Sequence, residues 1–304
     1  MNYTVRDRLE YGGVRAFQMF LGLFPLRVAF AFAWVILKIV FLLFRPKRGK
    51  IGKRIRQVFG PQTTQREIDR IAWLSLRNMI FNMIEMMRAD RFDKAWIDRH
   101  MPDYGPQIPM VKDLIKEYGG LVIAVPHFGN WDLAAVACRI YDIDLIAIAA
   151  KQRNPLLNAW INRTRTHGTR VIERGTGSAM LQIVKHLKSG GALAILPDLS
   201  RKVPDTRVEF LGGTANVADG MARFAYMAGV PVLAAAPHRV GWTHFHFEII
   251  TVVKPNPAAP EKEELLRITQ EVMSGFDREI RKYPGQWFWF NKRWILTEVE
   301  EEQS

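Results

Sequence analysis

The sequence predicts an α/β fold with a mixed central sheet flanked by helices and an apolar membrane-anchoring helix at the N-terminus. Short β-branched apolar runs alternate with longer amphipathic runs through most of the 304 residues, which is the pattern of strands and helices in α/β proteins. A hydrophobic content of 48% suffices for one large core and an appended membrane element. Residues 19–44 are almost entirely apolar. We therefore expect one folded domain attached to a membrane anchor.

Residues 1–56 are predicted to form the membrane anchor with its basic flank, and residues 57–304 the folded domain. A helix over residues 19–44 is long enough to span a hydrocarbon layer of about 30 Å. Two basic residues interrupt the apolar run, so a monotopic hairpin or a helix lying in the interface is the alternative to a crossing. Residues 45–56 contain seven basic residues and no acidic one, which is typical of the cytoplasmic flank of a membrane segment.

Beyond the anchor the predicted elements follow one another in a regular order. Residues 63–93 are expected to form a helical portion between the anchor and the sheet. Asn154 followed by Pro155 marks a helix start, and paired glycines precede the apolar runs at 121 and 192. Strands are predicted over residues 121–125, 143–149, 170–172, 192–196, 208–211, 230–236 and 244–253. Helices are predicted over residues 132–139, 155–166, 178–188, 218–228 and 261–282.

The net charge of +13 indicates anionic partners. Nucleic acid, acidic lipid head groups and an acidic carrier protein all meet this requirement. A nucleic-acid-binding protein would place its basic residues on a groove-reading helix or sheet, whereas the densest basic run here borders the apolar anchor. We therefore expect an anionic membrane surface as a partner, and no nucleic acid.

The segment from His127 to Asp132 is the strongest candidate for a catalytic site. His127 follows the predicted strand 121–125, and Asp132 falls in the first turn of the next helix. Loops at the carboxyl ends of buried strands are where open α/β sheets usually bind ligands. A carboxylate can fix the tautomer of an imidazole and leave its other nitrogen free as a general base. Taken singly, each residue also fits a structural role, since Asp is favoured in a first helical turn and a lone His is often only a satisfied polar residue.

Several segments, in this order, make the chain resemble the late acyltransferases of lipid A biosynthesis, within the glycerolipid acyltransferase superfamily. The resemblance covers nearly the whole chain. It rests on HFGNWD at 127–132, KQRNP at 151–155, RTR at 163–165 with Gly168, ALAILPD at 192–198, VEFLG at 208–212, GMARFA at 220–225 and QWFWFNKRW at 286–294.

This resemblance implies a glycerolipid acyltransferase-like fold and the transfer of an acyl chain from a thioester to a lipid hydroxyl. His127 would be the general base, and Asp132 would orient it and stabilise its cationic form, with no covalent intermediate, metal or other cofactor. The implied donor is acyl-carrier protein, with acyl-CoA as the alternative. The implied acceptor is a membrane glycolipid, a lipid A precursor. The implied location is the bacterial inner membrane, with the catalytic domain on the cytoplasmic face.

Further residues of the resembling segments are expected to bind the substrates. Backbone amides of the turn formed by Gly129, Asn130 and Trp131 at the helix start can meet the negative charge that develops on the thioester carbonyl. Basic side chains after the next strand suit a phosphate on the donor or the acceptor. Asp198, at a strand end, is expected to hold an arginine or a sugar hydroxyl. The full predicted set is Gly129, Asn130, Lys151, Arg153, Asn154, Asp198, Arg201 and Arg223.

Two departures from the family pattern leave alternatives open. Relatives carry Asp or Glu at the position of Asp132, and many carry Gln where this chain has Leu199. A related branch acylates mannosylated phosphatidylinositol. In the segment that follows the strand at 192–196, this chain (residues 197–201) resembles that branch about as closely as it resembles the lipid A enzymes. That lipid, or another polar lipid, with acyl-CoA as donor is therefore the alternative substrate pair. The alternative from another functional class is a membrane-bound scaffold without catalytic activity. The intact His127 and Asp132 argue against it.

Other chemistry lacks support in the sequence. Cys138 is the one cysteine, which excludes an intrachain disulfide framework and fits core packing. No G-x-S-x-G elbow, Walker loop or dinucleotide fingerprint is present. His244 and His246 alternate along a predicted strand, but no further residues complete a metal site. The aromatic run at 287–290 is expected to face the head-group layer, with a last strand capping the core as the alternative.

Overall fold

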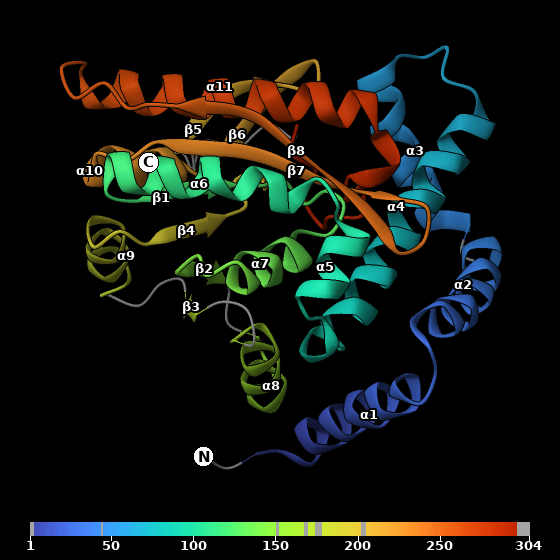
Figure 1. Cartoon of the computed structure of the whole chain (residues 1–304). Coiled ribbons are helices and arrows are strands. Elements are labelled where there is room, and N and C mark those ends of the chain that lie inside the picture. Colours follow the sequence, from blue (N-terminus) through green and yellow to red (C-terminus); the bar gives the residue numbers. More distant parts are fainter. Residues whose placement is uncertain are drawn as a thin grey trace.

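The computed structural model describes residues 3–43, 45–149, 152–166, 170–173, 178–201 and 205–296, and it confirms the α/β fold (Figure 1). The central sheet has six strands in the order β3-β2-β4-β1-β7-β8. Strand β8 runs antiparallel to β7, and the other neighbours are parallel, so the sheet is mixed. Its strands are β1 (Leu121–Ala124), β2 (Leu145–Ala149), β3 (Arg170–Glu173), β4 (Ala192–Ile195), β7 (Val232–Val240) and β8 (His244–Val253).

Helices cover both faces of this sheet. Because side chains alternate along a strand, Leu121 and Ile123 of β1 pack on one face, and Val122 and Ala124 on the other. The first face is covered by α5 (Lys94–His100), α6 (Tyr104–Tyr118) and α7 (Trp131–Ile140). The second is covered by α9 (Ala179–Lys188), α10 (Gly220–Ala228) and α11 (Glu261–Lys282). Figure 1 shows α11 and α7 on opposite sides of β7 and β8. Helix α8 (Pro155–Thr166) connects β2 to β3.

The N-terminal part of the chain is helical. Pro25 divides the apolar run, so that one helix ends at Gly22 and the next begins at Leu26. Of the described helices, the second is the one long and apolar enough to cross a membrane, with a mean hydropathy of 2.3. The expected helical portion at residues 63–93 is a long helix and a 3₁₀ turn. The elements are α1 (Val5–Gly22), α2 (Leu26–Leu43), α3 (Arg45–Phe59), α4 (Gln65–Met86) and η1 (Ala89–Arg91).

The strand predicted at residues 208–211 lies outside the central sheet. It is part of β5 (Thr206–Phe210), which pairs with β6 (Gly213–Val217) in a separate two-stranded antiparallel sheet. Leu211 and Gly212 have φ angles of 53° and 78° and form the two-residue turn between these strands. The short, small-residue sequence of β6 gave no strand signal, so the hairpin was not predicted.

The C-terminal aromatic segment packs into the domain. It follows the 3₁₀ turn η2 (Pro284–Gln286). Trp287 and Trp289 are 1% and 0% exposed, whereas Phe288 and Phe290 are half-buried. The core-capping alternative is therefore the right one for the two tryptophans, although the segment is irregular rather than a strand.

Candidate active site

Two neighbouring strands bring His127 and Asp198 together. Strands β1 and β4 are adjacent and parallel, and Ala124 pairs with Ile195 at their ends. His127 lies three residues beyond Ala124, and Asp198 lies three residues beyond Ile195. Because the carboxyl ends of parallel strands lie at the same edge of a sheet, these equal offsets place the two side chains next to each other.

Both oxygens of the Asp198 carboxylate accept hydrogen bonds. Oδ1 lies 2.7 Å from Nδ1 of His127, and Oδ2 accepts the backbone N–H of His127 and the indole N–H of Trp287, each at 2.8 Å. The Asp198 side chain is 0% exposed. Burial raises the pKa of this carboxyl, but the charge of His127 and the hydrogen bonds outweigh it, so that the pKa lies below its ordinary value. Asp198 is therefore an anion at neutral pH.

The contact with Asp198 fixes the tautomer of His127. An ionised carboxylate only accepts hydrogen bonds, so Nδ1 carries the proton and Nε2 holds the lone pair of the neutral ring. The ring stands edge-on to that of Trp131, with 5.1 Å between centroids, and the His127 side chain is 19% exposed. A general base needs this combination of a held ring and an accessible second nitrogen.

The loop after β1 has a backbone conformation that requires glycine. Gly129 has a φ of +55°, and a Cβ at this position would lie 1.5 Å from the carbonyl oxygen of Pro237. The N–H of Gly129 donates to the carbonyl oxygen of Gln286 at 3.0 Å. Asn130 then starts α7, since its Oδ1 accepts the N–H of Leu133 at 2.9 Å.

A buried ion pair and its hydrogen-bond partners contact this loop. Nη2 of Arg239 in β7 lies 2.5 Å from Oε2 of Glu85 in α4, and the two side chains are 0% and 1% exposed. Nδ2 of Asn130 donates to the same Glu85 oxygen at 2.5 Å, and Nδ2 of Asn82 donates to the carbonyl oxygen of Gly129. Burial raises the pKa of Glu85, and the positive charge of Arg239 opposes this. The pair and its hydrogen bonds thus tie α4 and β7 to the loop that carries His127.

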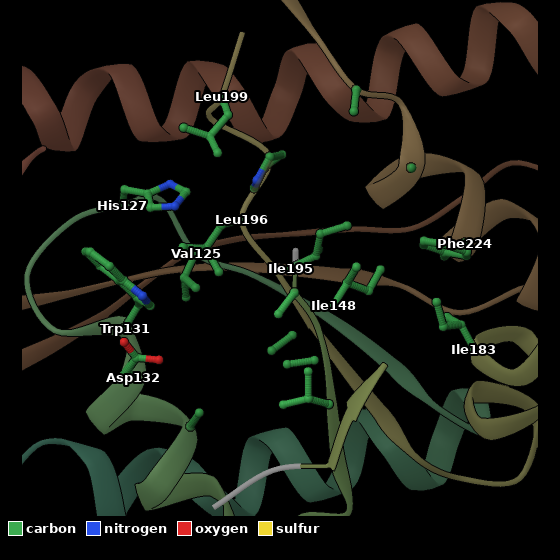
Figure 2. Close-up of a pocket in the computed structure, with 18 of the residues that line it drawn as sticks. Val125, His127, Trp131, Asp132, Ile148, Ile183, Ile195, Leu196, Leu199 and Phe224 are labelled. Carbon is green, nitrogen blue, oxygen red and sulfur yellow. The ribbon is translucent and has the colours of Figure 1, made fainter. Parts of the chain in front are cut away.

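A cavity of about 950 Å³ lies beside His127. Figure 2 shows His127, Trp131 and Asp132 at one side of it and Ile183 and Phe224 at the opposite side. The wall between these two sides is apolar and comes from the ends of β1, β2 and β4. Its labelled residues in Figure 2 are Val125, Ile148, Ile195 and Leu196. The cavity therefore offers a long apolar surface that begins at the histidine.

Asp132, the predicted partner of His127, lines this cavity from the first turn of α7 and is half-buried. The hydrogen bond at Nδ1 of His127 is made by Asp198, for which the sequence suggested contact with an arginine or a sugar hydroxyl. The carboxylate that orients the His127 ring is therefore Asp198 and not Asp132 as predicted. The role of Asp132 in stabilising the cationic form of His127 stays a prediction.

The residues after β2 that were predicted to bind substrate are not shown to lie beside His127. Lys151 lies outside the described residues. Arg153 is exposed on the loop before α8 and is not among the described residues that line the cavity. Asn154 caps α8, because its Oδ1 accepts the N–H groups of Leu156 and Leu157 at 3.0 and 3.2 Å.

The predicted arginines beyond β4 do line the cavity, together with acidic partners. Nε of Arg201 lies 3.3 Å from a carboxylate oxygen of Asp205. Arg223 bonds to Asp219 and, at 3.0 Å, to Glu261. These arginines are held in place by ion pairs, and their positive charge is partly compensated.

Several contributors to the site were not found in the sequence. Trp287 was noted only as an aromatic residue, yet its indole holds Asp198. Arg293, in the segment 286–294, also lines the cavity and was not among the predicted substrate-binding residues. Glu85 and Arg239 did give a usable signal. Glu85 is the one charged residue of the apolar run 83–87, and Arg239 lies near the end of a strand whose residues 232–237 are all apolar. Opposite charges at such positions indicate a buried pair.

A family model described as bacterial lipid A biosynthesis acyltransferase matches residues 10–295. No curated protein matches the chain. The matched range includes both strands that carry the site, the ion pair behind the loop, and the C-terminal segment that holds Asp198.

Proposed function

Because the chain belongs to the bacterial lipid A biosynthesis acyltransferase family, we propose that it moves a fatty acyl chain from an acyl thioester to a hydroxyl of a lipid A precursor. The observation that carries this proposal is the bond between Nδ1 of His127 and Asp198 at one side of a cavity with a long apolar wall. Such a site combines a general base with room for a hydrocarbon chain. Acyl transfer to a lipid hydroxyl needs both.

In the proposed reaction Nε2 of His127 takes the proton of the acceptor hydroxyl as the hydroxyl oxygen attacks the thioester carbon. Asp198 keeps Nδ1–H in place and stabilises the imidazolium that forms. The tetrahedral intermediate then collapses with cleavage of the C–S bond, and the imidazolium returns the proton to the leaving thiolate. The thioester is already activated, so no covalent acyl-enzyme is required.

The start of α7 is the proposed site for the negative charge that develops on the thioester oxygen. The amide of Gly129 is engaged by Gln286, so we assign this role to the backbone amides of Asn130 and Trp131, which also benefit from the helix dipole. Asp132 in the same turn is proposed to stabilise the cationic form of His127 together with Asp198.

The apolar wall of the cavity is the proposed binding site of the acyl chain. Each methylene that leaves water for such a wall contributes about 0.8 kcal/mol, so a chain running from His127 towards Ile183 and Phe224 is bound without polar contacts. Arg201, Arg223 and Arg293 line the same cavity. Guanidinium groups of this kind suit a phosphate of the acceptor or of the donor's phosphopantetheine arm.

The proposed donor is acyl-carrier protein, because the net charge of +13 favours an acidic protein partner. The proposed location is the bacterial inner membrane, with the cavity on the cytoplasmic side, where such a donor is available. The anionic membrane surface is the second proposed partner of the basic chain.

The test is the composition of lipid A after deletion of the gene in its native host. We expect a discrete loss of one acyl chain by mass spectrometry. If lipid A is unchanged and a mannosylated or other polar lipid loses the chain, the reaction class stands and the acceptor assignment is wrong. If no lipid changes and the purified protein transfers no acyl group, the chain is a membrane-bound scaffold and not an active acyltransferase.

A further inference from the structure

Helix α1 is attached to the folded domain near its first turn. Nδ2 of Asn154, the residue that caps α8, donates to the carbonyl oxygen of Asp7 at 3.1 Å and to Oε2 of Glu10 at 3.0 Å. Figure 1 shows α1 leading back from α2 towards α8. The first turns of α1 therefore lie beside the sheet domain.

The turn between α1 and α2 is attached as well. Nη1 of Arg88 donates to the carbonyl oxygens of Leu21 and Phe24 at 3.2 and 2.9 Å, and Nη1 of Arg91 donates to that of Gly22 at 2.9 Å. The last carbonyls of a helix have no partner within the helix, so these guanidinium groups complete the end of α1.

Helix α2 lies along α4. Phe30 stacks on Phe81 with ring centroids 4.0 Å apart, and Phe41, more than two turns later, contacts Trp73 at 5.5 Å. The ammonium group of Lys38 lies 4.4 Å from the centre of the same Trp73 ring. One face of α2 is thus covered by protein from Phe30 to Phe41, and α4 itself is part of the domain that carries the site.

The other face of α2 is apolar and exposed. Val28, Val35 and Leu42 follow one another at seven-residue intervals on this face and are 39%, 51% and 54% exposed. Helix α1 adds Leu9 and Phe20, which are 71% and 49% exposed. An exposed apolar face of this kind is stable against lipid and not against water.

We propose that α1 and α2, which are joined by a short turn, both lie in the plane of one leaflet of an anionic membrane, and that α2 does not cross the bilayer. A crossing helix of 18 residues is about 27 Å long at 1.5 Å per residue, and it would carry α1 to the far side, out of reach of Asn154. Exposed basic residues beside the apolar face indicate that the lipid is anionic. Lys50 and Lys53 are exposed on α3, the next helix after α2, and suit anionic head groups.

This placement sets the cavity at the membrane surface. Asn154, which holds the start of α1, is two residues from Gln152 of the cavity lining. Gln18 near the end of α1 donates to the carbonyl oxygen of Met87 at 2.6 Å, next to Met86 of the lining. Helix α1 therefore runs past two parts of the cavity lining. On this proposal, an acceptor lipid in the same leaflet would enter the cavity from the bilayer.

The depth of α2 tests this proposal independently of acyl transfer. In a Cys138→Ala background, Val28→Cys, Val35→Cys and Leu42→Cys each receive a fluorescent label, and the full-length protein is bound to vesicles of phosphatidylethanolamine and phosphatidylglycerol. Lipids with nitroxides at different depths then report the position of each label. We expect the three labels to lie at one depth, and a label at Leu266→Cys, on exposed α11, to be unquenched. A middle label clearly deeper than both outer ones, or no quenching at any of the three, would overturn the proposal.

The side of the membrane on which the N-terminus lies is a second test of whether α2 crosses the bilayer. Reporters fused to the N-terminus and, separately, to the C-terminus of the full chain are expected to lie on the same side. An N-terminal reporter on the opposite side would show that α2 crosses the membrane, whatever the activity of the protein.

Discussion

The indole N–H of Trp287 donates to Oδ2 of Asp198 at 2.8 Å, so that the C-terminal segment holds the carboxylate that binds His127. The same segment forms a bridge to Phe128 and donates the N–H of Phe288 to the carbonyl oxygen of His127 at 3.0 Å. The position of the proposed general base thus depends on two segments that lie far apart in the sequence, namely the loop after β1 and the segment after α11.

Trp287→Phe should change how stability depends on pH. Removing the indole N–H lets the pKa of Asp198 rise towards its ordinary value, because one of the bonds to its charged form is lost. A carboxyl with a lowered folded-state pKa stabilises the protein above its unfolded-state pKa, and this contribution disappears as the pH falls through the folded-state value. We therefore expect the substitution to cost more stability at pH 7 than in acid, measured by denaturant unfolding. An equal cost at both pH values would show that the indole acts only by filling space.

Asp198→Asn should reduce kcat by about 10²–10⁴-fold, because an amide neither fixes the Nδ1–H tautomer nor stabilises the imidazolium. The rate of acyl transfer by the purified variant measures this. Asp132→Asn is also expected to lower the rate, and Asp132→Glu to be partly tolerated. Activity of Asp198→Asn within a few-fold of wild type would remove Asp198 from the mechanism.

Combining each asparagine substitution with His127→Ala tests whether Asp198 and Asp132 act through the imidazole. If Asp198 and Asp132 act through the imidazole, neither asparagine substitution should slow the residual reaction further in a His127→Ala background. A full additional loss from either one in that background would place its contribution outside the base.

Glu85→Ala should destabilise the protein by about 3–5 kcal/mol, since it leaves the buried guanidinium of Arg239 without its counter-ion. Replacing both residues by methionine should recover much of this loss, because no buried charge then remains. Unfolding of the single and double variants in detergent measures the difference. If the single variant is as stable as wild type, the ion pair does not support the loop.

Ile183→Ala should shift the acyl preference towards longer chains, because it enlarges the end of the cavity that faces away from His127. Leu181→Ala is the matched control, as Leu181 lies on the same helix and is 72% exposed. Competition between acyl thioesters of different length measures the preference. The same shift in both variants, or none in Ile183→Ala, would mean that the acyl chain lies elsewhere.

Local signals in the sequence predicted the regular elements well. The helices over 155–166 and 261–282 have the predicted bounds, because Asn154 and Pro155 define the first start and charge patterning defines the second helix. Residues 94–118 were not assigned, although they form α5 and α6. Pro109 stands inside α6, and proline argues against a helix unless tertiary packing overrides it.

The candidate site could be predicted only in part for a different reason. His127 stands out locally, but its contact with Asp198 depends on β4 lying next to β1, and the order of strands in a sheet is not visible in a single sequence. The bond from Trp287 likewise depends on how a distant, irregular segment packs. Local reasoning therefore predicted His127 and its neighbour Asp132 as candidates, and the tertiary fold places Asp198 at Nδ1 of the histidine.

The most direct test of the account is the mass of a lipid A precursor after incubation with the purified full-length protein and an acyl thioester of acyl-carrier protein. We predict the gain of one acyl chain with wild type, and a rate at least about a hundredfold lower with His127→Ala, the scale expected for removing a general base. A precursor of unchanged mass with wild type, or acylation by His127→Ala within a few-fold of the wild-type rate, would contradict the account.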